Sequence, residues 1–99
     1  MHVENINLGI IKANKKHTFS ALLTNDTEHK IVVTHLKVGC SSCTDAKIQK
    51  NMLSSFDTSL INIAYTPSTL GIHDKFIIVY YTENNESKDY KFFFKGNVV

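Results

Sequence analysis

One stretch joins an apolar run to the only two cysteines of the chain: Ile31-Val32-Val33-Thr34-His35-Leu36-Lys37-Val38-Gly39-Cys40-Ser41-Ser42-Cys43-Thr44. Residues 31–38 are rich in β-branched side chains and apolar on both faces, which predicts a central β-strand. The Cys-x-x-Cys that follows fits a redox or metal motif, and it also fits a corner at the end of a strand in a small β-sandwich. The segments on either side favour the sandwich.

Short alternating segments lie on both sides of this stretch. Ile6, Leu8 and Ile10 alternate with polar residues and glycine, and residues 17–24 and 60–66 predict further strands. Residues 76–82 and 89–95 predict a final hairpin joined across 83–87, whereas residues 46–52 carry a brief helical spacing that predicts a short helix or an irregular segment. We therefore expect an all-β protein, with residues 1–99 forming one immunoglobulin-like β-sandwich of about seven antiparallel strands.

Composition and charge narrow the range of partners. The chain has 99 residues and a formal net charge of +2, and its basic residues are all lysines. Arginine is the residue that most often contacts phosphates and guanine in a bidentate way, so no nucleic-acid partner is expected. The longest apolar run, residues 76–81, is far too short to span a membrane, so no membrane partner is expected either.

The order of short motifs resembles a bacterial and phage immunoglobulin-like family related to the ASH/Hydin and PapD-like domains. Its opening segments are matched by Asn7-Leu8-Gly9-Ile10-Ile11 and by the strand ending at Leu23-Thr24-Asn25. Val38-Gly39-Cys40-Ser41-Ser42-Cys43-Thr44 stands where the family has Val-x-x-Cys-Gly-Cys-Thr, and later segments are matched by Ile61-Asn62-Ile63-Ala64-Tyr65 and Lys95-Gly96-Asn97-Val98. The resemblance implies an adhesive or scaffolding module with no established catalytic activity.

Two departures from this family concern its cysteines and its export. The family's cysteines are separated by one residue, and here two residues separate them. Bacterial members carry an export signal or a lipoprotein anchor, but Met1 is not followed here by a basic segment and an apolar run, so we expect no signal peptide. The resemblance therefore implies the family's fold and not its usual compartment.

Cys40 and Cys43 leave two interpretations open. The favoured one makes them packing residues at the end of a strand, because no βαβ pattern of a thioredoxin-like site surrounds them. A disulfide between them is geometrically possible but closes a loop too small to add much stability. The alternative is a thiol or metal site that also uses His35. Zinc needs four ligands, and nothing in the spacing brings His35 or His73 to the cysteines, so no cofactor or metal is expected.

Candidate catalytic acids are Asp45, Asp57 and Asp74. Each lies in a predicted loop or at a strand edge, where capping a turn is the usual role of aspartate. The chain has neither a Gly-x-Ser-x-Gly motif nor a phosphate-binding glycine loop, and it contains only four glycines. We therefore expect no enzymatic activity.

The run Phe92-Phe93-Phe94 puts aromatic side chains on both faces of one predicted strand. Adjacent strand residues point to opposite faces, so the outer two share a face and Phe93 takes the other. We expect one face to fill the core. An outward Phe93 beside an outward Tyr80 or Tyr81 would then form an apolar patch of the kind that marks contact sites.

Two further points bear on where a partner would bind. The lysine stems of Lys91 and Lys95 could cover Phe93 and remove the patch. Sandwich edges offer a second mode of contact, because exposed edges bind added strands. The segment 3–11 is a natural edge, and its residues Ile6 and Leu8 are candidates for contact.

These features together predict a structural module that binds other proteins in a larger assembly. The composition, rich in lysine, asparagine and isoleucine, is typical of an AT-rich genome, and order through to both termini would be typical of a chain held by neighbours. We expect a virion component such as a phage capsid decoration or tail-associated subunit, found in the virion or the host cytoplasm, with capsid or tail subunits as partners. The sequence leaves the oligomeric state open, and an envelope-associated adhesion module is the remaining alternative.

Overall fold

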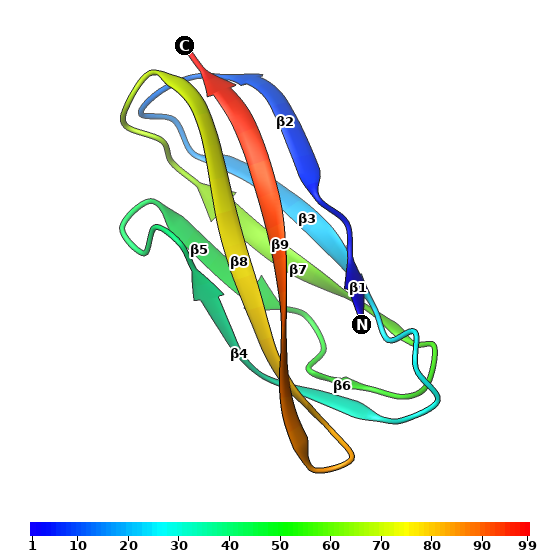
Figure 1. Ribbon diagram of the computed structural model, residues 1–99. Coiled ribbons are helices and arrows are strands. Elements are labelled where there is room, and N and C mark those ends of the chain that lie inside the picture. Colours follow the sequence, from blue (N-terminus) through cyan, green and yellow to red (C-terminus); the bar gives the residue numbers. More distant parts are fainter.

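The computed structural model describes residues 1–99, and all of its regular structure is β-strand. The strands are β1 His2–Val3, β2 Ile6–Ile11, β3 His17–Thr24, β4 Ile31–Val38, β5 Thr44–Ile48, β6 Met52–Leu53, β7 Thr58–Tyr65, β8 Gly71–Glu83 and β9 Glu86–Val98. They form a four-stranded sheet in the order β1-β3-β7-β5 and a five-stranded sheet in the order β2-β9-β8-β4-β6 (Figure 1). The predicted all-β sandwich is confirmed. No helix with the length and apolar character needed to cross a membrane is present.

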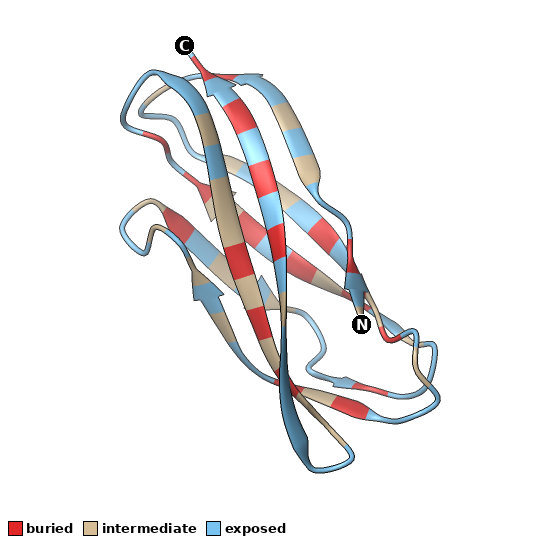
Figure 2. Cartoon of the chain, in the orientation of Figure 1, coloured by how far each residue is buried: buried red, intermediate tan, exposed pale blue.

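The core lies between the two sheets and follows the alternation of each strand. Buried and exposed bands succeed one another along β9, where Phe92, Phe94 and Val98 point inward (Figure 2). The Phe94 ring contacts the other sheet. Its centroid lies 5.3 Å from that of Phe19 on β3 and 5.0 Å from that of Tyr65 on β7. Edge-to-face contacts of this kind add to the free energy gained from burying the rings.

The predicted C-terminal hairpin is confirmed and is longer and tighter than expected. β8 and β9 pair without interruption from Gly71↔Val98 to Glu83↔Glu86. The two residues between them, Asn84 and Asn85, both have positive φ, at 51° and 62°. A two-residue turn with positive φ at both positions matches the right-handed twist of the strands, and asparagine tolerates it well.

β4 has the bounds that its sequence predicts, but it is not central along its whole length. It pairs with β8 throughout, whereas β6 reaches only Ile31 and Val32. Beyond that point Thr34, His35 and Lys37 are exposed. The expectation of two buried faces is therefore wrong for the second half of the strand.

The helix or irregular segment expected over residues 46–52 is wrong, because residues 44–48 form strand β5 on the edge of the four-stranded sheet. Thr44 is buried, and Ala46 and Ile48 are half-buried on the same face. The helical spacing rested on Ile48 and Met52, but five ladder partners on β7 outweigh so short a pattern.

The N-terminal segment crosses from one sheet to the other. Val3 pairs with Leu23 on β3, whereas three residues later Ile6 pairs with Phe94 on β9. The β2–β9 pairing is parallel, so the expectation of antiparallel strands throughout is corrected at this position. The predicted edge is real, because β2 is the outermost strand of the five-stranded sheet.

A bulge at Gly9 reverses the side chains that follow it in β2. The ladder shifts between Asn7 and Gly9, and Gly9 has a φ of +71° in the left-handed region that glycine tolerates best. Ile11 is consequently buried, and Ile10 is 75% exposed. Simple alternation from Ile6 through Leu8 predicts the opposite for these two residues.

The β3–β4 loop is tied to β6 by one buried amide. Asn25 is fully buried, and its Nδ2 donates to the carbonyl oxygens of Ser54 at 2.9 Å and His29 at 2.8 Å. Its Oδ1 accepts from the hydroxyl of Thr27 at 2.7 Å and from the same residue's backbone N–H at 3.1 Å. Asn25 thus holds the short strand β6 against the edge of β4.

Candidate functional site

The solvent side of β2, β9 and β8 carries the largest exposed apolar side chains of the five-stranded sheet. The ladders place these side chains in rows: Ile10–Asn97–Ile72, then Asn7–Lys95–Asp74, then Phe93–Phe76. We call this surface the outer face, comprising Asn5, Asn7, Ile10, Ile72, Asp74, Phe76, Phe93, Lys95 and Asn97. Neighbouring strands lie about 4.8 Å apart, so each row is compact enough for one partner to contact all of it.

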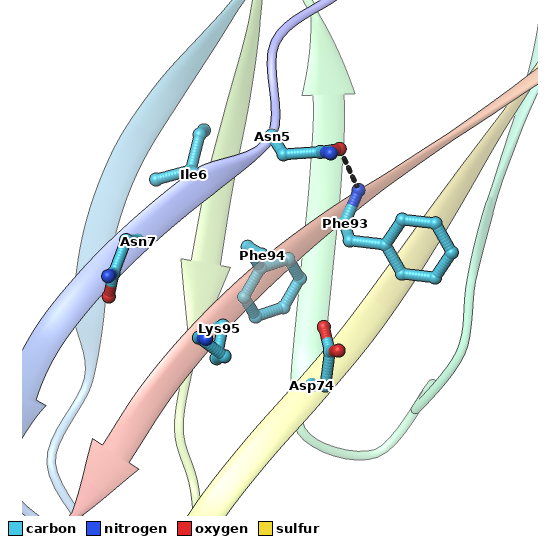
Figure 3. A pocket seen from close by; sticks show the side chains of 7 residues that line it. All are labelled: Asn5, Ile6, Asn7, Asp74, Phe93, Phe94 and Lys95. Carbon is cyan, nitrogen blue, oxygen red and sulfur yellow. Dashed lines mark hydrogen bonds between the residues drawn. The ribbon is translucent and has the colours of Figure 1, made fainter.

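Phe93 is held in position by the residue that precedes β2. The side-chain Oδ1 of Asn5 accepts a hydrogen bond from the Phe93 N–H at 2.9 Å (Figure 3). That N–H has no partner on β2 because the parallel ladder begins one pair later, at Ile6↔Phe94. The Asn5 amide thus replaces a missing rung, and the Phe93 ring is left 40% exposed.

Two shallow hollows follow one another along the outer face. The first, of about 330 Å³, lies among Asn5, Asn7, Asp74, Phe93 and Lys95 (Figure 3). The second, of about 230 Å³, is bounded by Ile10 and Ile72, and it shares Asn7 and Lys95 with the first. The shared residues make the pair one continuous depression with apolar walls at both ends.

The middle of this depression contains two charges that have no partner within the chain. Asp74 and Lys95 face each other across the β8–β9 ladder. Neither takes part in any of the four salt bridges of the protein. A carboxylate and an ammonium group are therefore both available to hydrogen-bond a molecule that covers the apolar walls.

The lysines that could have covered Phe93 lie elsewhere or beside it. Lys91 places its Nζ 4.7 Å from the centroid of the Phe76 ring, a cation–π contact on the neighbouring strand. Lys95 lines the first hollow next to Phe93. Phe93 therefore stays accessible at the edge of the depression.

The two tyrosines proposed to accompany Phe93 do not adjoin it. Phe93 pairs with Phe76, whereas Tyr80 pairs with Asp89, four rungs further along the hairpin. Tyr80 faces outward and stacks on His35 with ring centroids 5.9 Å apart. Tyr81 is only 7% exposed and points into the core, where burial raises its pKa above the usual value, so its placement on a contact patch is corrected.

The edge residues Ile6 and Leu8 are partly buried against the core, so they present less apolar surface than expected. Ile10 and Ile72 are 75% and 76% exposed and take that role instead. The sequence offers one signal for Ile10, namely the glycine before it, which is typical of a bulge. For Ile72 the only signal is the unbroken length of the hairpin strand.

The cysteines occupy the corner between β4 and β5, as the strand-end interpretation predicts. They are joined by a disulfide, and Cys43 packs on the edge of the core. His35 stacks on Tyr80, and His73 is hydrogen-bonded to the hydroxyl of Tyr65 at 3.2 Å. No three histidine, cysteine or acidic side chains lie together in an arrangement that could hold a metal ion.

The candidate catalytic acids are dispersed over the molecule. Asp57 caps a turn by accepting from the Thr58 N–H at 2.9 Å, and its bond to Lys50, at 2.6 Å, lowers its pKa. Asp45 is exposed on β5, and Asp74 lies on the outer face. They share no common site, and the turn-capping role expected of these residues is confirmed at Asp57.

The family of this chain is established by sequence. Residues 1–98 match the model of the protein family of unknown function DUF1573. The chain belongs to this family. No protein with a curated description matches it well enough to count as a relative.

Solved structures of several proteins share the fold. The VesB protease of Vibrio cholerae is 14% identical with a TM-score of 0.80, over 95% of this chain and 30% of that one, so this chain spans less than a third of VesB. The ASH/PapD-like domain 7 of human CEP192 is 12% identical with a TM-score of 0.68, covering 99% and 84% of the two chains. WR4, an MSP family member of C. elegans, is 10% identical with a TM-score of 0.65, covering 96% and 92%. At these identities the similarity concerns the fold alone, and it confirms the immunoglobulin-like class.

Proposed function

We propose that this protein is a non-catalytic module that binds another protein through the outer face and so acts within a larger assembly. The observation that carries the proposal is the exposed apolar surface at the two ends of the depression. Ile10 and Ile72 are each about three-quarters exposed, and Phe93 lies at the opposite end. Solvent-exposed apolar side chains grouped around a hollow are typical of protein contact sites.

The polar centre of the depression supports a protein partner over a small apolar ligand. Asp74 and Lys95 offer one acceptor group and one donor group, while the hollows are shallow and open to solvent. Small-molecule sites usually enclose most of their ligand, whereas protein interfaces combine an apolar centre with scattered hydrogen bonds. The fold shared with PapD-like and MSP domains supplies the scaffold for such a surface.

The finer proposal is that the assembly is a virus particle, with this chain as a capsid decoration or tail-associated subunit. Its support is the composition, rich in lysine, asparagine and isoleucine, together with the small size of the chain. The virion and the host cytoplasm are then its proposed locations. Gradient sedimentation of material from the native source, with mass spectrometry across the fractions, tests this step. Migration with particles of very high mass supports it, and a free monomer overturns it.

The outer face is tested by Phe93→Asp and Ile72→Asp in the same sedimentation experiment. Each change puts a charge on an apolar wall, so co-migration should be lost. Leu22→Asp is the matched control, because Leu22 is 49% exposed on the four-stranded sheet, and this variant should still co-migrate. If all three variants co-migrate equally well, the outer face is not the contact surface.

The disulfide favours a second candidate, an adhesion module in the cell envelope. Disulfides persist in oxidising compartments and are rare in the cytosol, and Cys40 and Cys43 are bridged. Alkylation of native material before and after reduction, read by mass spectrometry, separates the two locations. Two free thiols support the cytoplasm, whereas a bridged form recovered outside the cytoplasm supports the envelope.

A further inference from the structure

On one side of the sandwich the edges of the two sheets lie next to each other, and no strand of one sheet pairs with a strand of the other. The second half of β4 pairs with β8 alone, and β5 pairs with β7 alone. These two strands belong to different sheets, yet they run side by side (Figure 1). A groove of about 540 Å³ lies between their free sides, with Leu36, Ala46, Ile48, Lys47 and Asn51 among its lining residues. We call it the β4–β5 groove.

Backbone hydrogen-bonding groups face this groove from β4. The Gly39 N–H donates to the carbonyl oxygen of Phe76 on β8 at 3.0 Å. In an antiparallel strand, alternate residues direct their N–H and C=O groups to opposite sides. The groups of Lys37 therefore also face β8, and those of Leu36 and Val38 face the groove, where no strand pairs with them.

The same alternation applies to β5. The Gln49 N–H donates to the carbonyl oxygen of Leu60 on β7 at 2.8 Å. The N–H and C=O groups of Ala46 and Ile48 consequently point away from β7 and into the groove. Both walls are thus strand edges of the kind that accept an added strand.

The floor of the groove is apolar and its only formal charge is positive. Leu36, Ala46 and Ile48 are half-buried side chains of the two strands. Lys47 takes part in none of the protein's salt bridges, and no carboxylate lines the groove. A strand carrying small apolar side chains on one face and acidic ones on the other complements this surface.

Both ends of the groove are fixed by covalent or hydrogen bonds. At one end the Cys40–Cys43 disulfide closes the corner that joins β4 to β5, and the Thr44 N–H donates to the Cys40 carbonyl oxygen at 2.9 Å. At the other end the Val33 N–H donates to the Asn51 carbonyl oxygen at 2.7 Å. A groove held in this way loses little conformational entropy when a strand binds.

We propose that the β4–β5 groove binds an extended acidic segment of a partner protein as an added β-strand. The segment pairs with the free backbone groups of Leu36 and Val38 and rests its apolar side chains on the floor. Its carboxylates lie within reach of Lys47. The groove is separate from the outer face, and the two proposed binding sites are tested independently of each other.

The probe is an acetylated seven-residue peptide of alternating valine and glutamate, added to the full-length chain. Amide hydrogen exchange measured by NMR should slow roughly tenfold at Leu36 and Val38, because each new rung protects an N–H that now faces water. A peptide in which lysine replaces glutamate should leave these rates unchanged. Failure of the glutamate peptide to slow exchange at both residues overturns the proposal.

Charge reversal at the edge of the groove sharpens the test. Lys47→Glu should remove the protection by the glutamate peptide and allow the lysine peptide to protect the same two amides. Lys12→Glu changes the net charge by the same amount outside the groove and should leave the original preference intact. Protection confined to residues around Phe93 would place the peptide on the outer face instead. Protection that grows with protein concentration, without peptide, would replace the partner with a second copy of this chain.

Discussion

The sheet edges on the two sides of this sandwich are built differently. On one side the N-terminal segment crosses between the sheets, pairing first with β3 and then with β9, and it ends in a bulged strand. On the other side β4 and β5 face each other across a groove that is closed only at its ends, by the disulfide corner and by the hydrogen bond from Val33 to Asn51. Edges are the parts of a sheet most able to pair with another chain. We call the first the crossing side and the second the open side. A bulge interrupts the edge strand of the crossing side, whereas the second half of β4 keeps an uninterrupted row of backbone groups available on the open side.

The largest expected effect comes from truncating the core beside the crossing side. Phe94→Ala removes a fully buried ring that contacts Phe19 and Tyr65, and it should lower the free energy of unfolding by about 4 kcal/mol. Leu36→Ala on the open side removes a half-buried side chain and should cost about 1 kcal/mol. Urea unfolding of both variants measures the difference, and equal losses would mean that the two sides are equally well packed.

The next largest effect should come from loosening β6, the short strand that pairs with the edge of β4 opposite β8. Asn25→Ala deletes the amide that holds the β6 end of the open side, leaving the part-buried carbonyl oxygens of His29 and Ser54 without this donor. A loss of roughly 3 kcal/mol is expected in urea unfolding, with faster amide exchange at Leu53. Ser55→Ala removes a single exposed hydrogen bond to the same loop and serves as the control. Wild-type stability of Asn25→Ala would show that β6 needs no such tie.

A change at the bulge tests the crossing side itself. Gly9→Val forces a β-branched residue into a φ of +71° and should cost about 2 kcal/mol. Gly9→Asn should cost less, because asparagine tolerates the left-handed region. Nothing lies within 4 Å of the position of an added Cβ, so the loss reflects the backbone and not a clash. If valine and asparagine cost the same, the left-handed backbone at position 9 is not what determines the loss of stability.

The smallest expected effect is a loss of stability at alkaline pH. Burial raises the pKa of Tyr65, which packs against Phe94, and that of Tyr81, which pairs with Val33 on the open side. The stability that a raised pKa contributes is fully present below the usual tyrosine value near 10 and is lost as pH rises through the folded-state value. Unfolding followed between pH 8 and pH 11 should therefore show declining stability. Tyr65→Phe and Tyr81→Phe should each reduce the decline, and the larger reduction identifies the tyrosine whose pKa folding raises more.

The sequence was sufficient for the features that depend on local alternation. The bounds of β4, the C-terminal hairpin and the outward direction of Phe93 all follow from period-two patterning and turn residues. Strand β5 was missed because its register is set by β7, which is distant in the chain. In β8 the residues are apolar on both faces, so parity alone could not place Tyr80 outside and Tyr81 inside.

The candidate surfaces depend still more on distant pairing. Ile10 and Ile72 lie in one row of the outer face because β9 pairs with the strands of both residues. The bulge at Gly9 decides which isoleucine of β2 faces outward. The groove beside Leu36 exists because β6 stops after two residues. No window of the sequence contains both partners of either arrangement, so only the assembled sheets show it.

The pairing of β2 with β9 also limits the order in which the strands can come together. Asn5 and Phe93 are 88 residues apart, so β2 has no partner until β9 has been synthesised. Parallel pairing over such a separation forms slowly, because the entropy of closing the loop must be lost first. Until then β2 is an unpaired strand that carries Ile10, one of the two exposed isoleucines of the outer face. A nascent chain is thus most exposed to misassembly at the same end of the sequence that later completes the five-stranded sheet.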